Sequence, residues 1–148
     1  MSDVILLDSG PVGLLTHPRN PPHAADCRVW LHDLLAAGRR VILPEVIDYE
    51  VRRELLRLGS FTALNHLDSL GVQLEYLPLA SAVMRHAAGL WAHVRTAGLP
   101  TADIHALDID VILAAQALSL QVPVVVATDN VAHLSRFVTA EPWHRIAP

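Results

Sequence analysis

The sequence predicts an α/β domain in which helices cover both faces of a single parallel sheet. Three apolar segments rich in β-branched residues, at residues 4–7, 41–43 and 122–127, are typical of buried parallel strands. Segments with helical periodicity separate them, which implies right-handed βαβ crossovers. With 148 residues, the chain is most simply one domain over residues 1–148.

Glycine and proline mark the boundaries of the remaining elements. The predicted helices are those of residues 24–37, 44–58, 61–70, 80–97 and 104–118. Gly38, Gly59 and Gly98 follow three of these helices and predict their ends. Residues 17–22 are crowded with proline and asparagine and predict a loop. Residues 72–77 alternate more weakly and predict an edge strand.

The composition indicates a globular chain without a membrane span. Hydrophobic residues make up 52% and charged residues 18%, which favours extensive burial. No apolar run approaches the roughly 20 residues that a bilayer requires. The N-terminus lacks a basic leader, so we expect no cleaved signal peptide and a cytoplasmic location. Cys27 is the only cysteine, which excludes an internal disulfide and a cysteine-rich zinc site.

The net charge of −4 lacks the broad basic footprint of a dedicated nucleic-acid binder. It also counts carboxylates that a bound metal would neutralise, so it is weak evidence against a nucleic-acid substrate. Local basic groups that can contact phosphates are Arg39, Arg40, Arg52, Arg53 and Arg57. Solvated charge on a helix surface is the favoured interpretation of these arginines.

Asp8 is the first candidate site residue. It follows the apolar run of residues 4–7 and precedes Ser9, Gly10 and Pro11, so a carboxylate lies where a buried strand meets a turn. Open α/β sheets bind their ligands at that position. We therefore predict a pocket of carboxylates that gathers a divalent metal.

Two glutamates fall within the apolar arc of the helix at residues 44–58. Glu50 and Glu54 have apolar neighbours that should face the core. An isolated buried carboxylate is very costly, so each must be neutralised, paired or bound to a cation. For Glu54 we favour an ion pair with a nearby arginine. For Glu50 an ion pair and a bound cation are equally open.

The apolar stripe of residues 104–118 follows helical spacing closely. Asp103 and Asp110 lie on one edge of that stripe, and Asp108 lies on the opposite edge. Asp110 is therefore the better candidate for a site beside the sheet. Asp103 is interpreted as an acid in a first turn that complements the helix dipole.

Thr128, Asp129 and Asn130 end the last predicted strand, and all three can serve as oxygen ligands or as helix caps. Side chains alternate along a strand, so Thr128 and Asn130 would point to one side and Asp129 to the other. The alternation leaves open which side faces Asp8.

Other familiar sites lack support. His86 and His93 are seven residues apart, with no second cluster at the spacing of zinc ligands. The sequence contains no nucleophile elbow, phosphate-binding glycine loop or dinucleotide fingerprint. These observations disfavour zinc enzymes, serine hydrolases and nucleotide-binding proteins.

Four segments in the same order along nearly the whole chain carry a family resemblance. They are VILLDSG, LPEVIDYEVRREL, LDIDVILAAQAL and VVVATDNVAHL. Together they resemble the PIN-domain family, and within it the VapC-type toxins. The resemblance implies a three-layer α/β/α fold with a central parallel sheet of four or five strands.

The resemblance also implies which acids form the site. Asp8 matches the family's first acid, Glu50 in YEVRREL the glutamate of the middle helix, and Asp110 before VILAA the acid of the late helix. The family's fourth acid usually stands two residues after a threonine, where this chain has Asn130, and Asp129 lies one residue before it. Either residue could fill that position, or one metal position could be weakened.

The function implied by the resemblance is RNA cleavage with Mg²⁺ or Mn²⁺, with homodimerisation and inhibition by a VapB-type antitoxin. Our hypothesis is that Asp8, Glu50 and Asp110 hold the metal. In it the residues that position waters or a second ion are Asn130, Asp129 and Thr128, and the supporting residues are Ser9 and Asp108. Oxygen ligands suit such hard cations.

Two other functions compete with a metal-dependent endoribonuclease. One is a nucleic-acid-binding module whose altered fourth position has abolished catalysis. The other is a small metal-dependent phosphatase on a similar sheet. RNA cleavage upon addition of Mg²⁺ or Mn²⁺ distinguishes the nuclease from the binding module, and hydrolysis of phosphomonoesters would identify a phosphatase.

Overall fold

The computed structural model describes residues 3–98 and 104–148, and these contain a five-stranded parallel sheet with strand order β3-β2-β1-β4-β5. The strands are β1 (Val4–Leu7), β2 (Val41–Pro44), β3 (Glu75–Leu77), β4 (Val124–Thr128) and β5 (Ala140–Pro142). In the central strand, Ile5 pairs with Val41 of β2, and Leu7 pairs with Ala127 of β4. The predicted parallel sheet is confirmed.

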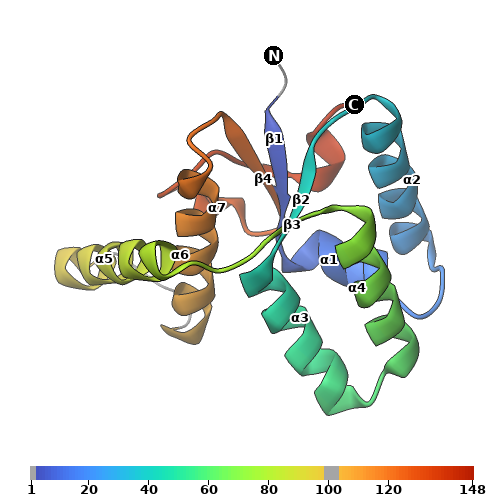
Figure 1. The fold of residues 1–148 in the computed structure, drawn as a ribbon, viewed down its shortest axis with the longest axis horizontal. Coiled ribbons are helices and arrows are strands. Elements are labelled where there is room, and N and C mark those ends of the chain that lie inside the picture. The colour runs from blue at the N-terminus through green and yellow to red at the C-terminus, as the bar shows by residue number, and fades with distance from the viewer. Residues whose placement is uncertain (1–2, 99–103) are drawn as a thin grey trace.

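Helices cover both faces of this sheet and complete three layers. They are α1 (Ser9–Thr16), α2 (Pro22–Ala36), α3 (Glu45–Leu58), α4 (Phe61–Gln73), α5 (Ser81–Ala97), α6 (Ile104–Ser119) and the short α7 (Val131–Leu134), followed by a 3₁₀ turn at Trp143–Arg145. Helices α2 and α4 lie on one side of the sheet, and α5, α6 and α7 lie on the other (Figure 1). None of the helices in the described ranges is long and apolar enough to cross a bilayer.

Burial explains the continuous apolar character of the central strands. Every residue of β1 and β2 is buried, because a parallel strand covered on both faces has no side that meets water. Helix α6 packs in the middle of its own layer. Its residue Leu113 joins the sheet core, whereas Val111 and Ala115 pack against α5.

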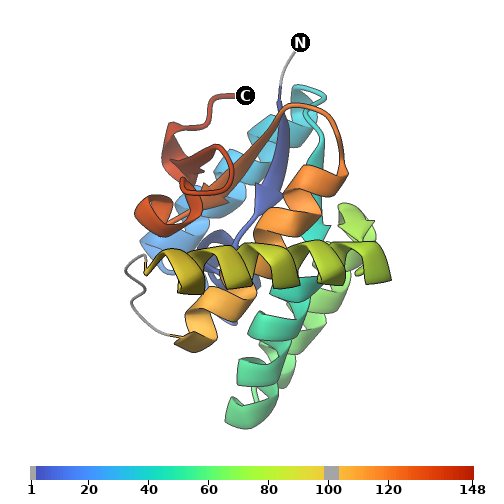
Figure 2. The same ribbon diagram turned by 90° about the vertical axis from the view of Figure 1, so that its left-hand side faces the viewer.

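The distal half of α3 extends beyond the sheet together with α4 (Figure 2). Gly59 ends α3 in the left-handed conformation with φ of 65°, as predicted. The expectation that the apolar neighbours of Glu54 face the core is wrong for Leu58, which is 61% exposed, and the Glu54 side chain itself is 53% exposed. The helix continues past the edge of the sheet, so Leu58 lies beyond the packed core.

The predicted strand at residues 72–77 is only partly correct. Residues 75–77 form the edge strand β3, but Val72 belongs to the last turn of α4 and is 88% exposed. Alternation over six residues did not distinguish the end of a helix from the start of a strand. Helix α1 and strand β5 were not predicted, because α1 is short and begins with the glycine and proline that signalled a turn.

Candidate functional site

The candidate site lies at the carboxyl ends of β1 and β4, where the strand order reverses. The chain moves from β1 to β2 and β3 on one side, and β4 and β5 lie on the other side of β1. Asp8 directly follows β1, and its N–H donates to the carbonyl of Ala127 in β4 at 3.0 Å. Such a reversal leaves a crevice at the ends of the strands, which is where open α/β sheets bind ligands.

Both carboxylate oxygens of Asp8 are held by hydrogen bonds. The N–H of Ser9 donates to Oδ1 at 2.7 Å, and the Thr128 hydroxyl donates to Oδ2 at 2.7 Å. Asp8 is only 7% exposed, and it caps the N-terminus of α1. Burial raises the pKa of Asp8, whereas the bonds from Thr128 and Ser9 lower it, because they stabilise the charged form.

Glu50 and Asp110 join Asp8 in one acidic cluster. Burial raises the pKa of Glu50, and the charge of Asp8 raises it further. Burial also raises the pKa of Asp110 to about 7, with added contributions from the charges of Asp8 and Glu50, while Arg136 acts in the opposite direction. The structure therefore brings together the three acids on which the predicted site depends.

The oxygen donors of the cluster are of the type that a hard divalent cation prefers. Three carboxylates that repel one another are stabilised by a positive charge between them, and oxygen ligands suit Mg²⁺ and Mn²⁺. Oε2 of Glu50 is buried and has no hydrogen-bond partner among the described residues, so it can accept an ion or a water. Within the described ranges, no three His, Cys, Asp or Glu side chains lie close enough together to hold a metal ion directly. Mg²⁺ usually keeps several waters and is bound through one or two carboxylates, so direct coordination by all three acids is not required.

The three polar residues that end β4 point to different places. Thr128 is fully buried and faces Asp8, whereas Asn130 is exposed, and its amide nitrogen lies 2.9 Å from the His133 ring. Oδ2 of Asp129 lies 2.1 Å from where a Cβ on Gly10 would be, so the carboxylate occupies space that a side chain there would fill. The charge of Asp129 raises the pKa of Asp8. Asp129 thus lies on the Asp8 side of the cluster.

The other predicted acids lie elsewhere. Asp108 is exposed and lines a depression between α5 and α6 with Met84 and Trp91, away from the cluster. Glu54 forms the favoured ion pair, with Arg57. Asp103 lies outside the described residues.

Gln116 is a buried polar residue that sequence reasoning did not single out. Its Oε1 accepts a hydrogen bond from the N–H of Val46 at 3.3 Å, and its Nε2 donates to the carbonyl of Leu77 at 2.9 Å. The side chain therefore ties α6, which carries Asp110, to the start of α3, which carries Glu50. In the sequence, Gln116 is marked only as a single amide within the apolar run of residues 111–118, off the predicted stripe.

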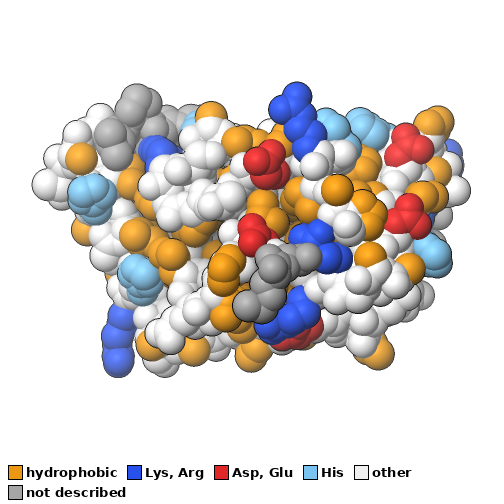
Figure 3. Space-filling view, turned by 90° about the horizontal axis from the view of Figure 1, so that it is seen from above, with side chains coloured by type: hydrophobic (Ala, Val, Ile, Leu, Met, Phe, Trp, Pro, Cys, Tyr) orange, Lys and Arg blue, Asp and Glu red, His pale blue; other side chains and the backbone are white. Residues whose placement is uncertain are grey.

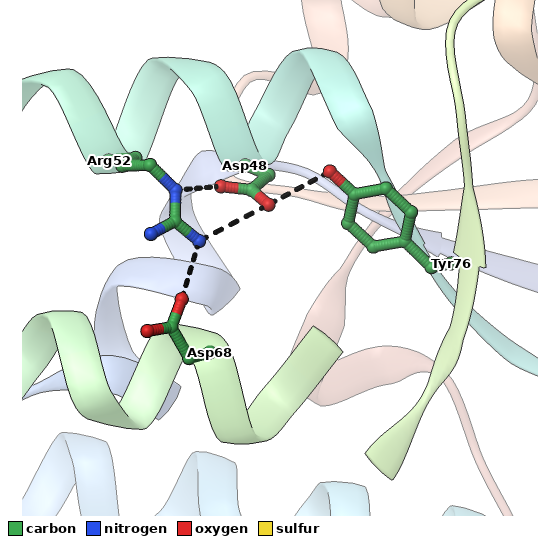
Figure 4. Close-up of polar contacts among 4 residues, drawn as sticks. All are labelled: Asp48, Arg52, Asp68 and Tyr76. Carbon is green, nitrogen blue, oxygen red and sulfur yellow. Dashed lines mark hydrogen bonds and ion pairs between the residues drawn. The ribbon is translucent and has the colours of Figure 1, made fainter. Parts of the chain in front are cut away.

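Most of the arginines considered as phosphate contacts are engaged within the protein. Arg52 pairs with Asp48 and Asp68, and Tyr76 donates its hydroxyl to Asp48 in the same network (Figure 4). Arg57 pairs with Glu54.

At the amino-terminal edge of the sheet, basic and acidic side chains are interspersed (Figure 3). The ion pair there joins Arg40 to Glu75, and Arg39 donates to the backbone carbonyl of Ala147.

Comparison with known proteins supports the fold. No family model and no curated protein sequence matches the chain. Among solved structures, VapBC2 from Rickettsia felis bound to a DNA fragment from their promoter matches with a TM-score of 0.70 and 14% identity, over 93% of this chain and 97% of that one. FitAcB from Neisseria gonorrhoeae matches with a TM-score of 0.69 and 21% identity, over 97% and 100%.

A third structure agrees with these two. VapBC-1 from nontypeable Haemophilus influenzae matches with a TM-score of 0.67 and 16% identity, over 96% of this chain and 99% of that one. The matches extend over nearly the full length of both chains. The chain therefore has the PIN-domain fold of these VapBC and FitAcB structures, as the sequence resemblance implied.

Proposed function

We propose that this PIN-fold chain is a metal-dependent endoribonuclease that hydrolyses RNA phosphodiester bonds. The observation that carries the proposal is the acidic cluster of Asp8, Glu50 and Asp110 at the reversal point of the sheet, which includes a buried Glu50 oxygen with no partner among the described residues. Carboxylates in that arrangement are costly unless a cation compensates them.

The residues have distinct proposed roles. Asp8, with both oxygens fixed by Ser9 and Thr128, is the preorganised anionic ligand. Asp110 has a pKa near neutrality in the metal-free protein and ionises fully beside a cation. Glu50 offers its unpaired Oε2 to an ion or to an attacking water. Mg²⁺ or Mn²⁺, when bound, supplies Lewis-acid activation of water and neutralises charge on the scissile phosphate.

The proposed partners follow from the same likeness. Two of the matching solved structures are VapBC assemblies, so we propose a VapB-type antitoxin as a partner of this chain and propose that the chain is the toxin. We also propose a homodimer. Light scattering of the purified chain tests the homodimer. Light scattering after coexpression with the product of a small gene next to the one that encodes this chain tests the complex with an antitoxin.

One observation favours an alternative, a binding module without catalysis. Asn130, at the position of the family's fourth acid, turns its amide toward His133. If the fourth position is essential, the cluster could bind nucleic acid through a metal without cleaving it.

A cleavage assay separates the two functions. The wild type, Asp8→Asn, Asp110→Asn and Asp108→Asn are incubated with a pool of structured RNAs and Mg²⁺, Mn²⁺ or chelator. We expect cleavage with metal by the wild type and by Asp108→Asn, whose substituted acid is exposed and remote. We expect at least about a 100-fold loss in the other two variants. RNA binding without cleavage by the wild type would instead identify the binding module.

A further inference from the structure

Tyr49 and Arg53 form a stacked pair on the surface of α3. The guanidinium carbon of Arg53 lies 5.1 Å from the centroid of the Tyr49 ring. Tyr49 is 56% exposed, and Arg53 is also exposed. An exposed ring with a cation on one face presents its other surface to solvent, where a flat partner can stack.

The pair borders the acidic cluster. Viewed down α3, Arg53 lies about 60° and Tyr49 about 100° from Glu50 on the same side of the helix. Val46 lies on that side as well, and its N–H contacts Gln116 of α6. The pair therefore lies on the side of α3 that carries Glu50 of the acidic cluster. The charge of Arg53 also acts on Glu50, whose pKa it lowers.

Arg53 differs from its neighbours Arg52 and Arg57 in forming no direct ion pair with a carboxylate. Arg52 is held by Asp48 and Asp68, and Arg57 by Glu54. Among the described residues, Arg53 forms no direct ion pair; it stacks on the Tyr49 ring, and its charge lowers the pKa of Glu50 and of Glu54. A guanidinium without a carboxylate partner, next to a site for phosphodiester chemistry, is available for a phosphate.

We propose that Tyr49 and Arg53 form a nucleotide subsite of the active site, in which a base of single-stranded RNA stacks on Tyr49 and Arg53 contacts an adjacent phosphate. This inference rests on the proposed nuclease function and deepens it. Sequence-specific recognition of RNA favours unpaired bases stacked on aromatic or guanidinium planes. Stacking of this kind tolerates different bases, so the subsite would orient the strand.

The same type of pair occurs on α5, which supplies a control. Arg95 lies 5.7 Å from the centroid of the Trp91 ring, also four residues apart on a helix. Such pairs are ordinary features of helix surfaces. Tyr49 and Arg53 differ from the pair on α5 in lying beside Glu50.

The test measures binding of a fluorescent single-stranded oligoribonucleotide by anisotropy in chelator, where metal-dependent cleavage cannot consume the probe. We expect Tyr49→Ala to bind roughly 5- to 100-fold more weakly, as loss of one stacked base implies. Tyr49→Phe should bind like the wild type. Arg53→Gln should bind more weakly and show a smaller dependence on salt. Arg95→Gln and Phe61→Ala, the latter removing a ring 74% exposed on α4, should leave binding unchanged.

A second probe isolates the base contact. An oligoribonucleotide with abasic positions should bind wild type and Tyr49→Ala equally, because the stacking partner is gone. Equal binding of the intact probe by wild type and Tyr49→Ala, or no binding by the wild type, would overturn the subsite. Failure of metal-dependent cleavage while these binding differences persist would overturn the nuclease and leave the subsite in place.

Discussion

The hydroxyl of Thr128 donates a 2.7 Å hydrogen bond to Oδ2 of Asp8 across 120 residues of sequence. This bond joins the carboxyl ends of two neighbouring strands at the point where the sheet reverses. Oγ1 of Thr128 also accepts the N–H of Asn130 at 2.8 Å, so one buried hydroxyl organises both sides of the crevice. Because Ser9 holds the other oxygen, Asp8 has little freedom to rotate. A preorganised metal site requires ligands that are already held in position before the metal binds.

Replacement of Thr128 by valine should make metal binding require a higher pH. The Thr128 hydrogen bond lowers the pKa of Asp8, so its loss raises that pKa, and Asp8 ionises only at higher pH. Titration of Mn²⁺ by electron paramagnetic resonance at several pH values measures the shift. Unfolding stability should fall by about 1 kcal/mol. The exposed Thr139→Val variant is the matched control, and an unchanged midpoint in Thr128→Val would contradict the prediction.

Asp110→Asn should stabilise the metal-free protein at neutral and alkaline pH. The pKa of Asp110 is raised to about 7 in the folded protein, against about 3.9 in an unfolded chain. Between those values the folded state binds more protons, so this residue's contribution to stability falls as pH rises. Removal of the charge should therefore add roughly 1–3 kcal/mol at about pH 8 and little at about pH 4. Urea unfolding at both pH values measures it.

The exposed Asp108 on the same helix supplies the control. Asp108→Asn should change stability by less than about 0.5 kcal/mol at either pH. Saturating Mn²⁺ should reverse the order of wild type and Asp110→Asn, because only the wild type retains the full set of acids, and a ligand stabilises the state that binds it. If Asp110→Asn were less stable than the wild type in chelator at about pH 8, the repulsion within the cluster would be disproved.

Asp129 should matter more than Asn130 for metal binding. The carboxylate of Asp129 lies over Gly10 beside Asp8, whereas Asn130 is turned to His133. We expect Asp129→Asn to weaken Mn²⁺ binding at about pH 8 more than Asn130→Ala does. Gly10→Ala should resemble Asp129→Asn, because its Cβ would displace that carboxylate. The opposite order in Mn²⁺ titrations would assign the fourth position to Asn130.

The fold was largely predictable because its strongest signals are local. The continuous apolar segments of β1, β2 and β4 need burial on both faces, and glycines in the left-handed conformation end α3 and α5. The edge of the sheet was less predictable. Strand β3 has only three residues, and the apolar residue Val72 before it is exposed at the end of a helix. Short edge strands carry little pattern.

The three acids of the candidate cluster could be selected from the sequence, whereas their arrangement could not. Asp8, Glu50 and Asp110 stand out because each is an acid at the end, within or at the edge of an apolar pattern. The bond from Thr128 to Asp8 joins residues whose contact no periodicity encodes. The approach of Asp129 to Gly10 likewise joins residues that are far apart in the sequence. Gln116 lies off the predicted apolar stripe of its helix, and its two backbone partners come from α3 and β3.

Gln116→Leu should loosen the connection between the helices that carry Glu50 and Asp110. The side chain is fully buried, and leucine is similar in size but cannot satisfy the N–H of Val46 or the carbonyl of Leu77. Two buried polar groups without partners should lower stability by about 2–4 kcal/mol.

Affinity for Mn²⁺ should fall as well, measured well below the unfolding midpoint so that the protein remains folded. Gln73→Leu, an exposed position at the end of α4, controls for the change in side chain. Loss of stability with unchanged Mn²⁺ affinity would show that Gln116 supports the core without positioning the acids.

Arg52 and Arg57 form ion pairs on the same helix that should differ in their contribution to stability. Arg52 bridges Asp48 on α3 and Asp68 on α4, and Asp48 also receives the Tyr76 hydroxyl from β3, so the network joins three elements (Figure 4). The Asp48 side chain is only 13% exposed, and removal of Arg52 would leave its charge poorly solvated. Arg52→Met should therefore cost about 1–2 kcal/mol.

Arg57→Met should leave stability without a measurable change. Its partner Glu54 lies on the same helix, and both side chains are more than half exposed, so water replaces the lost contact. The midpoints of urea unfolding with an unchanged slope compare the two variants directly. Equal midpoints would mean that the network of Arg52 is as dispensable as an exposed surface pair, and that the packing of α3 on α4 depends on apolar contacts alone.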